Sequence, residues 1–437
     1  VIPVPFQTPG YAANSRPSPA EIAATQLDQL SPEERVGQLF LITFNGTDAS
    51  PATPIYELIT KYHIGGVILK RENDNFSSSD QIPQNCWELI QELQTVEFNS
   101  SILADEGSGN SASSQPSQYI PLFIGASQEG NLSSYSEIMD GISPIPSQMS
   151  IGATWDPAIA QQVGTQVGQE LSKLGINLLL GPNLDVMSDP SPGLSDLGVR
   201  SFGGDPFWVA KLGQSYIKGV HLGSQNNIAV VAKYFPGLGS SDRLPEQEVA
   251  TVRKTLDQLR QIDLAPFLAV TGNAPDPESS ADALLNSHIR YQGLQGNIRS
   301  TTRPISLDPQ AFELLMSLSP LGTWRDSGGV IVSDNLGSQA LQNLYDPAGQ
   351  SYNINRVAVD AFIASNDILY LGNYGDVNKP IPSYEIIDTI ELFVQKYTED
   401  QNFADRVDNS VLRILTLKNK IYFSFNLSSV LTPENGL

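Results

Sequence analysis

The stretch "DPAIAQQVGTQVGQELSKLGINLLLG", residues 156–181, contains one repeat of the pattern that decides the fold. Its first part has apolar residues at helical spacing, with Asp156 as the predicted N-cap, Pro157 at the first helical position and Gly175 as the stop. Its last part is a short, continuously apolar run, which is typical of a strand buried on both faces of a sheet. The stretch "DPFWVAKLGQSYIKGVHLG", from Asp205, repeats the helical pattern. Helices and buried strands therefore alternate along this part of the chain.

Short apolar runs of this kind recur along the whole sequence, and helical patterns separate them. Repeated strand–helix units predict a parallel sheet. Eight such strands predict a (β/α)8 TIM-type barrel, an α/β fold whose functional residues lie at the carboxyl ends of the strands. The eight expected strands are residues 39–44, 65–70, 121–126, 176–181, 228–233, 283–288, 328–334 and 367–373.

The remaining segments suggest additions to one large domain over residues 31–437. Two amphipathic helices are expected from about residue 384, packed against the barrel. Residues 99–119 are rich in serine and are expected to form a surface loop. Residues 1–30, rich in proline, serine and alanine, are expected to form an extended leader or linker. Such a leader is compatible with export behind a signal or lipid anchor, but it assigns no compartment.

The charge and cysteine content exclude several classes of protein. The formal net charge of −22, from 47 acidic and 25 basic residues, argues against nucleic acid or an anionic membrane surface as a partner. No apolar run approaches the roughly 18 residues that a membrane-spanning helix needs. Cys86 is the only cysteine, so an internal disulfide and a cysteine-based metal cluster are excluded. Paired histidines at metal spacing and a phosphate-binding glycine loop are also absent, so we expect no metal and no cofactor.

Four polar residues stand at or near the ends of expected strands. Asp334, Lys233 and His288 end the seventh, fifth and sixth of them, and Asp185 follows the fourth. Each alone has a structural explanation, because aspartate is a good N-cap, lysine often marks a solvated strand end, and histidine is often a satisfied polar residue. Together at one barrel mouth, they predict a polar pocket for a hydroxyl-rich ligand.

Several motifs, in this order and spacing, resemble the catalytic domain of glycoside hydrolase family 3, and the match is closest to bacterial β-N-acetylglucosaminidases. The resemblance covers roughly residues 32–373. It implies a (β/α)8 barrel that hydrolyses β-linked sugars, here N-acetylglucosaminides, with retention through a covalent glycosyl-enzyme. The carbohydrate substrate is the one partner that it implies. The motifs are "PLFIGASQEG" (121–130), "GVRSFGGDP" (198–206), "VAKYFPGLG" (231–239), "LLNSHIRY" (284–291) and "GGVIVSDNLG" (328–337).

The resemblance also implies roles for individual residues. Asp334 falls on the nucleophile, and a carboxylate is chemically fit for this role because it can attack the anomeric carbon and stabilise positive charge there. Arg200 and Lys233 fall on ligands of the sugar hydroxyls, to which charged donors make strong hydrogen bonds. The other expected substrate-binding residues are Tyr234, His288, Asp185 and Ser127.

The sequence departs from the family pattern at two motifs. Where the family has Asp-Gln-Glu-Gly-Gly-Arg, this chain has Ser-Gln-Glu-Gly-Asn-Leu at 127–132, which removes one charged contact to the terminal sugar and an arginine. Where bacterial N-acetylglucosaminidases have Lys-His-Phe-Pro-Gly-His-Gly and then Asp-Ser-His, the acid/base, this chain has "KYFPGLGSSDRLPEQE" at 233–248. Because no histidine lies between His221 and His288, a local imidazole acid is excluded.

Three carboxyls of this segment are candidates for the missing proton donor. Asp242 is the best placed, because it follows the loop glycines as the aspartate of the family does. Arg243 next to it would lower its pKa, which does not suit an acid. Glu246 and Glu248 are expected in the first turn of the next helix, where acidic residues commonly serve the helix dipole.

Two functional hypotheses remain open. The first is an active retaining glycosidase with Asp334 as nucleophile and Asp242 as candidate acid/base. The second is a family 3 barrel that has lost turnover, because the Asp-Ser-His motif is absent, and that serves as a sugar-binding protein.

Overall fold

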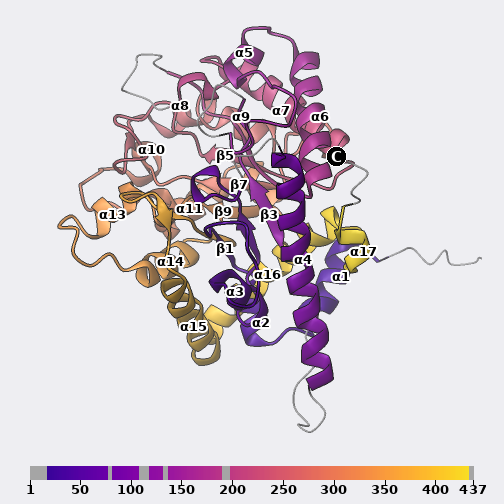
Figure 1. Cartoon of the computed structure of the whole chain (residues 1–437). Helices are drawn as coiled ribbons and strands as arrows, with labels where there is room; N and C mark the ends of the chain where they lie inside the picture. Colours follow the sequence, from indigo (N-terminus) through magenta and orange to yellow (C-terminus); the bar gives the residue numbers. More distant parts are fainter. Residues whose placement is uncertain (1–16, 77–80, 108–117, 131–135, 189–196, 433–437) are drawn as a thin grey trace, which may run out of the picture.

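A closed ring of eight parallel strands forms the centre of the molecule (Figure 1). The computed structural model describes residues 17–76, 81–107, 118–130, 136–188 and 197–432. The strand order is β10-β1-β2-β3-β4-β5-β7-β9, and a parallel bridge between Val332 and Ile368 joins the two ends. This confirms the predicted (β/α)8 barrel and all eight predicted strands. The strands are β1 (Phe40–Ile42), β2 (Gly66–Ile68), β3 (Phe123–Ala126), β4 (Leu178–Asn183), β5 (Ala229–Phe235), β7 (Ala283–Asn286), β9 (Val330–Ser333) and β10 (Leu369–Leu371).

Helices cover the outside of the ring. Figure 1 shows α6 and α7 together at the upper end of the molecule, and α2 and α15 at the lower end. The helices between the strands are α3 (Pro54–Thr60), α4 (Ile82–Gly107), α5 (Gln148–Gly152), α6 (Pro157–Leu174), α7 (Pro206–Gly223), α8 (Leu256–Gln261), α9 (Ala265–Ala269), α10 (Gln292–Gln295), α11 (Pro309–Met316), α12 (Leu321–Asp326), α13 (Gln339–Tyr345) and α14 (Ile354–Ile363).

Helix α6 begins and ends where the sequence predicts. The Asp156 carboxylate accepts the Ala158 amide at 2.9 Å, and Gly175 closes the helix at φ 92°, a left-handed conformation that favours glycine. The helix packs tightly against α7 through small residues. A Cβ on Gly164 would lie 2.2 Å from the Tyr216 carbonyl oxygen, so the contact between these two helices requires glycine there.

The two predicted C-terminal helices are present as α15 (Ser383–Glu399) and α16 (Gln401–Ile421). A short helix, α17 (Leu427–Val430), follows them. None of the helices in the described part of the chain has the length and hydropathy that crossing a lipid bilayer requires.

Two segments differ from the expectation. Within residues 1–30, expected as an extended leader, Pro19–Leu27 form helix α1, followed by α2 (Pro32–Gly37), while residues 1–16 lie outside the described residues. Helix α1 is capped by Ser18 and Glu21, and its Gln26 accepts a hydrogen bond from Asn419 of α16 at 2.6 Å. Of the loop expected over residues 99–119, residues 99–107 continue helix α4. Residues 108–117 lie outside the described part of the chain.

Lys418 of α16 is a fully buried lysine. Its ammonium donates to the side-chain oxygen of Gln38 at 2.7 Å and to the Gly65 carbonyl at 2.9 Å, and it lies 4.9 Å from the centre of the Phe123 ring. Burial lowers the pKa of Lys418 to about 7, although the nearby Glu97 carboxyl acts in the opposite direction. Burial raises the pKa of Glu97 to about 8.

This lysine predicts a pH dependence of stability. Since the folded-state pKa of Lys418 is lower than the unfolded value, the unfolded chain binds more protons between about pH 7 and 10.5, so the free energy of unfolding rises with pH there. Between pH 8.5 and 10, above the Glu97 transition, wild type should gain about 2 kcal/mol relative to Lys418→Met. Urea denaturation of both proteins at the two pH values measures this gain. Parallel pH profiles for the two proteins would contradict the assignment.

Candidate active site

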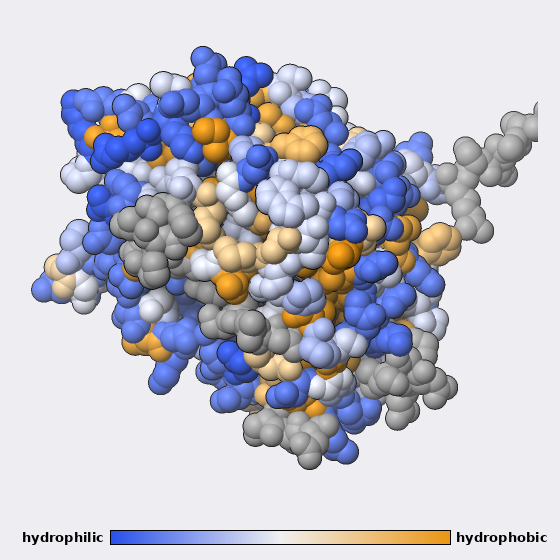
Figure 2. Space-filling view, turned by 90° about the horizontal axis from the view of Figure 1, so that it is seen from above, coloured by the Kyte–Doolittle hydropathy of each residue, from blue (hydrophilic) through white to orange (hydrophobic). Residues whose placement is uncertain are grey.

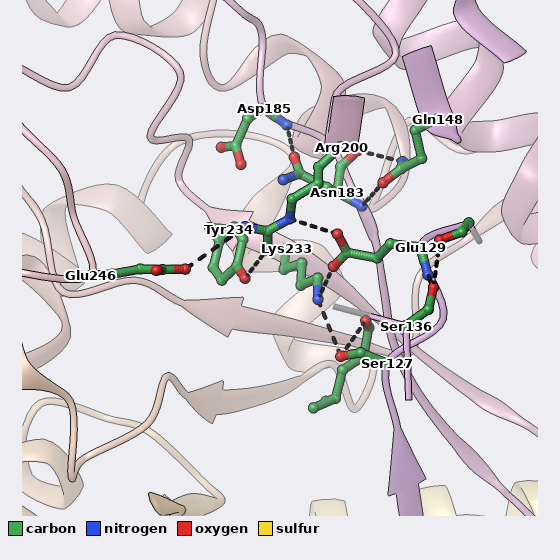
Figure 3. Close-up of polar contacts among 12 residues, drawn as sticks. Ser127, Glu129, Ser136, Gln148, Asn183, Asp185, Arg200, Lys233, Tyr234 and Glu246 are labelled. Carbon is green, nitrogen blue, oxygen red and sulfur yellow. Dashed lines mark hydrogen bonds and ion pairs between the residues drawn. The ribbon is translucent and has the colours of Figure 1, made fainter. Parts of the chain in front are cut away.

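A buried carboxylate, Glu129, lies at the centre of a polar cluster at the carboxyl ends of β3, β4 and β5 (Figure 3). Glu129 follows β3, Lys233 lies near the end of β5, and Arg200 ends the short 3-10 helix η2 (Gly198–Arg200). The Arg200 Nε donates to the Glu129 Oε2 at 2.6 Å. The Lys233 ammonium forms an ion pair with the Glu129 Oε1. Two strand ends and a loop therefore converge on one carboxylate.

Two further side chains complete this arrangement. The Lys233 ammonium donates to the Ser127 Oγ at 3.3 Å, and an Arg200 Nη donates to the Tyr234 hydroxyl. The Tyr234 ring also lies under both cations, 5.4 Å from each. We call Ser127, Glu129, Arg200, Lys233 and Tyr234 the Glu129 cluster. The structure thus brings together four of the predicted substrate-binding residues around a carboxylate that the sequence reasoning did not select.

The charges of the Glu129 cluster stabilise one another. Burial alone would raise the pKa of Glu129, but Arg200 and Lys233 outweigh it and keep this pKa below the ordinary value. Burial lowers the pKa of Lys233, opposed mainly by Glu129 and, more weakly, by Asp334. The N–H groups of Arg200 and Lys233 are donors, so the cluster favours ligand oxygens as hydrogen-bond acceptors.

Asp334 lies just after β9 and is half-buried. Its Oδ1 accepts the Asn335 amide at 2.8 Å, and its own amide donates to the Asn286 carbonyl at 3.1 Å. Asp334 is close enough to Lys233 and His288 to stabilise the charged form of each. The alternative explanation as an N-cap does not hold, since the following helix α13 is capped by Ser338.

His288 contacts the backbone of the residue that follows Asp334. Its Nε2 lies 3.0 Å from the Asn335 carbonyl, which can only accept, so this nitrogen carries the proton. The Nδ1 then accepts from the Ser306 hydroxyl at 2.8 Å. Burial lowers the pKa of His288, which favours the neutral ring, and both ring nitrogens are engaged in these contacts.

Asp185 contacts the glycine-rich loop after β5. It is fully buried, and its Oδ1 accepts the Leu238 amide at 2.7 Å, which holds the glycine-rich loop after β5. A Cβ on Gly239 would lie 2.0 Å from the Val186 carbonyl oxygen, so the loop can approach the segment after β4 this closely only with glycine there. The last residue of β4, Asn183, is held through its backbone: the Gln148 side chain of α5 donates to its carbonyl and accepts its amide (Figure 3).

The segment after this loop differs from the expected helix. Residues 245–247 form a turn, and Thr251–Val252 form a strand, β6, that pairs with β8 (Arg290–Tyr291). Helix α8 begins only at Leu256. Glu246 and Glu248 are therefore in a loop, not in the first turn of a helix.

The three candidate carboxyls of this loop have different surroundings. Asp242 accepts the Thr251 amide at 2.8 Å and pairs with Arg243 and Arg253 at 3.1 and 3.3 Å. Burial would raise the pKa of Asp242, but the Thr251 amide and Arg243 outweigh it and lower this pKa. The Glu248 carboxylate also pairs with Arg243, at 2.7 Å.

Glu246 is the candidate that points toward the Glu129 cluster. Its Oε1 lies 3.9 Å from an Arg200 Nη, and half of its side chain is exposed (52%). Figure 3 shows its carboxylate extending toward Arg200 and Tyr234. It is therefore the carboxyl of this loop that faces the candidate site.

A second polar group near Asp334 was missed by the sequence reasoning. Tyr370, in β10, interacts electrostatically with Asp334, with Lys70 at the end of β2 and with Glu137. The Lys70 ammonium pairs with Glu72, and Glu137 accepts the Arg71 amide at 2.8 Å. Lys70 ends an expected strand, so the rule that selected Lys233 could have found it.

A (β/α)8 barrel with acidic and basic side chains gathered at the carboxyl ends of its strands is typical of an enzyme whose active site lies at that face. Within the ranges that the structure describes, no three His, Cys, Asp or Glu side chains are grouped to hold a metal ion. A comparison of the sequence with models of protein families identifies the family. Residues 31–417 match the glycosyl hydrolase family 3 N terminal domain, so the chain belongs to glycosyl hydrolase family 3.

Individual relatives are similar at a lower level. A beta-hexosaminidase A of Pseudoalteromonas piscicida is 27% identical over 376 residues, which cover 84% of this chain but only 55% of the relative. The beta-hexosaminidase LpqI of Mycobacterium tuberculosis is 24% identical, with 89% of this chain and 83% of the relative covered. A solved glycoside hydrolase family 3 beta-N-acetylglucosaminidase of Paenibacillus sp. superposes with a TM-score of 0.72 at 26% identity, covering 90% of this chain and 63% of that one. The chain thus spans a little over half the length of the first of these relatives.

Proposed function

We propose that the chain hydrolyses β-linked N-acetylglucosaminides with retention, through a covalent glycosyl-enzyme on Asp334. The observation that carries the proposal is the half-buried Asp334 at the end of β9, beside Lys233 and the neutral His288. The membership in family 3 and the beta-hexosaminidase and beta-N-acetylglucosaminidase names of the relatives support the substrate class.

Each group of residues has its own role in the proposed hydrolysis. The Glu129 cluster binds hydroxyls of the terminal sugar, chiefly through Arg200 and Lys233. This places the anomeric carbon against Asp334, whose carboxylate attacks it and forms an ester as the glycosidic bond breaks. Water then hydrolyses the ester, with a second carboxyl acting first as acid toward the leaving oxygen and then as base toward the water.

We propose Glu246 as this second carboxyl, in place of Asp242. Both arginine pairs and the Thr251 amide favour the ionised form of Asp242 and hold it away from the site. Glu246 comes from the same loop, faces Arg200 and is exposed enough to meet a leaving group and water.

The acid assignment predicts a substrate-dependent loss of activity. Glu246→Gln should lower kcat/KM for chitobiose by about 100-fold or more, because its leaving sugar needs protonation. The loss should be much smaller for 4-nitrophenyl β-N-acetylglucosaminide, whose leaving group is already a weak base. Steady-state rates on both substrates measure this difference, and the basic limb of the pH profile for chitobiose should flatten.

Asp242→Asn is the matched variant, from the same loop and with the same loss of one charge. Its ratio of kcat/KM for chitobiose to kcat/KM for 4-nitrophenyl β-N-acetylglucosaminide should equal that of wild type. If Asp242→Asn showed the selective loss on chitobiose and Glu246→Gln did not, the roles would be reversed and the original expectation for Asp242 restored.

The alternative function is sugar binding without turnover. It is favoured by the missing Asp-Ser-His motif and by the engagement of Asp242 with two arginines. Calorimetry with N-acetylglucosamine, combined with product analysis on chitobiose and muropeptides, separates the two functions. Binding with no product from any of these substrates would favour the alternative.

A further inference from the structure

Three aromatic side chains form an exposed group outside the Glu129 cluster. Trp155 and Phe207 are 55% and 67% exposed, which is unusual for such large apolar rings. Both contact Trp208 edge to face, with centroid separations of 5.1 Å from Trp155 and 5.5 Å from Phe207. We call these three residues the aromatic platform. Its outer rings present apolar surface to solvent in a defined arrangement.

The backbone holds Trp155 in an unfavourable conformation. Its φ of 53° is left-handed, a region that a bulky side chain rarely adopts. The turn is fixed by the Trp155 amide, which donates to the Gly152 carbonyl at 3.1 Å, and by the Thr154 hydroxyl, which donates to the Ile151 carbonyl at 2.7 Å. A strained backbone that keeps an indole in solvent, where it gains little packing energy, points to a use for that indole.

The aromatic platform lies on the same face of the barrel as the candidate site. Trp155 directly precedes α6, which follows β3, and Phe207 and Trp208 lie in the first turn of α7, which follows β4. The amino ends of such helices lie at the carboxyl ends of the strands. Figure 2 looks onto the end of the molecule where α5 and α7 lie in Figure 1, and pale and hydrophobic residues occupy the middle of that view among hydrophilic ones.

Two short segments connect the aromatic platform to the candidate site. Helix α5 begins at Gln148, which binds Asn183, and leads to Trp155. From Arg200 the chain reaches Phe207 in seven residues, which span at most about 25 Å. The two segments also touch, since a Cβ on Gly152 would lie 1.8 Å from the Phe202 carbonyl oxygen.

From this placement we infer that the aromatic platform is a carbohydrate-binding surface for the sugar units beyond the one held by the Glu129 cluster, and that it takes a β-linked chain of N-acetylglucosamine units. This inference rests on the proposed function for the kind of sugar. The C–H groups on the faces of a β-linked pyranose carry partial positive charge and match the negative faces of aromatic rings.

The surrounding charge favours an uncharged polymer over other occupants. The Asp156 and Asp205 carboxylates cap α6 and α7 next to the rings, and they would repel phosphates of nucleic acid or lipid. The formal net charge of the chain, −22, acts in the same direction.

Calorimetry with chitotetraose and with N-acetylglucosamine tests the inference, in an Asp334→Asn background that prevents turnover. The double variant Trp155→Ala and Phe207→Ala should bind chitotetraose about tenfold more weakly, while its affinity for the monosaccharide changes less than about twofold. Tyr384→Ala, which removes an equally exposed ring (64%) from α15, is the matched control and should change neither affinity. Circular dichroism verifies that the variants are folded.

Equal affinity of the double variant and its background for chitotetraose would overturn the inference. A dimer in sedimentation that the double variant dissociates, without loss of chitotetraose affinity, would also overturn it and assign the rings to contact between copies. The measurement is independent of hydrolysis. If the chain never turns over a substrate but binds chitotetraose through these rings, the proposed function is wrong and the inference about the aromatic platform is confirmed.

Discussion

Asp334→Asn is expected to lower kcat for 4-nitrophenyl β-N-acetylglucosaminide by about 10⁴-fold or more, the largest effect of any single substitution considered for this chain. An amide cannot form the glycosyl ester, and it carries no charge to stabilise the oxocarbenium-like transition state. The activated aryl leaving group needs little protonation, so the first step, which kcat/KM reports, depends little on the acid, and an equal loss in kcat/KM for this substrate reports on the nucleophile.

Asp376→Asn is the control for this change, since Asp376 is an exposed aspartate whose carboxylate accepts only a Gln342 side chain at 3.2 Å among the contacts described. It should retain wild-type activity. Hydrolysis by Asp334→Asn at more than about a tenth of the wild-type rate would exclude Asp334 as the nucleophile.

Glu129→Gln is expected to have the largest effect on stability. Arg200 and Lys233 are both buried and both pair closely with Glu129, so the amide would remove the carboxylate that the two cations share. Breaking a buried ion pair by removing one partner typically costs about 3–5 kcal/mol. The free energy of unfolding, measured by urea denaturation, should fall by this amount.

A second variant separates the charge effect from packing. Adding Lys233→Met to Glu129→Gln removes the unpaired lysine and should recover part of the lost stability. Glu313→Gln on the exposed face of α11 is the surface control and should change the free energy of unfolding by less than about 0.5 kcal/mol. A loss from Glu129→Gln as small as this control would show that the cluster is not electrostatically coupled.

The barrel itself could be predicted because its signals are local. The α6 pattern of Asp156, Pro157 and Gly175 defines a helix from its own capping groups, and β4 begins with three leucines, 178–180, because both of its faces are covered. Helix α1 had the same kind of signal. Ser18 and Glu21 form a capping box, which could have been recognised within the proline-rich start of the chain.

The segment after β5 could not be predicted, because distant residues determine its structure. Val249 and the strand β6 are held by Arg290 and Tyr291, about 40 positions along the chain: the Arg290 guanidinium donates to the Val249 carbonyl at 3.1 Å, and β6 pairs with β8. These contacts override the helical pattern of "PEQEVATVRKTLDQLRQ", so the helix starts only at Leu256. The orientations of Asp242 and Glu246 follow from that tertiary pairing.

The candidate site likewise combines residues with a local sequence signal and residues without one. The ends of the expected strands predicted that Lys233 and Asp334 lie at one mouth of the barrel. Glu129 could not be recognised as the common partner of Arg200 and Lys233, because that role depends on three segments that meet only in the folded chain.

The covalent intermediate on Asp334 is the central claim, and trapping it is the most direct test. A slowly turned-over 5-fluoro glycosyl fluoride of N-acetylglucosamine should accumulate the glycosyl-enzyme, which intact mass spectrometry detects as one added sugar unit. Peptide mapping should place that sugar on Asp334, and the Asp334→Asn variant should remain unlabelled. A label on another residue, or hydrolysis of the reagent with no label at any time, would contradict the account.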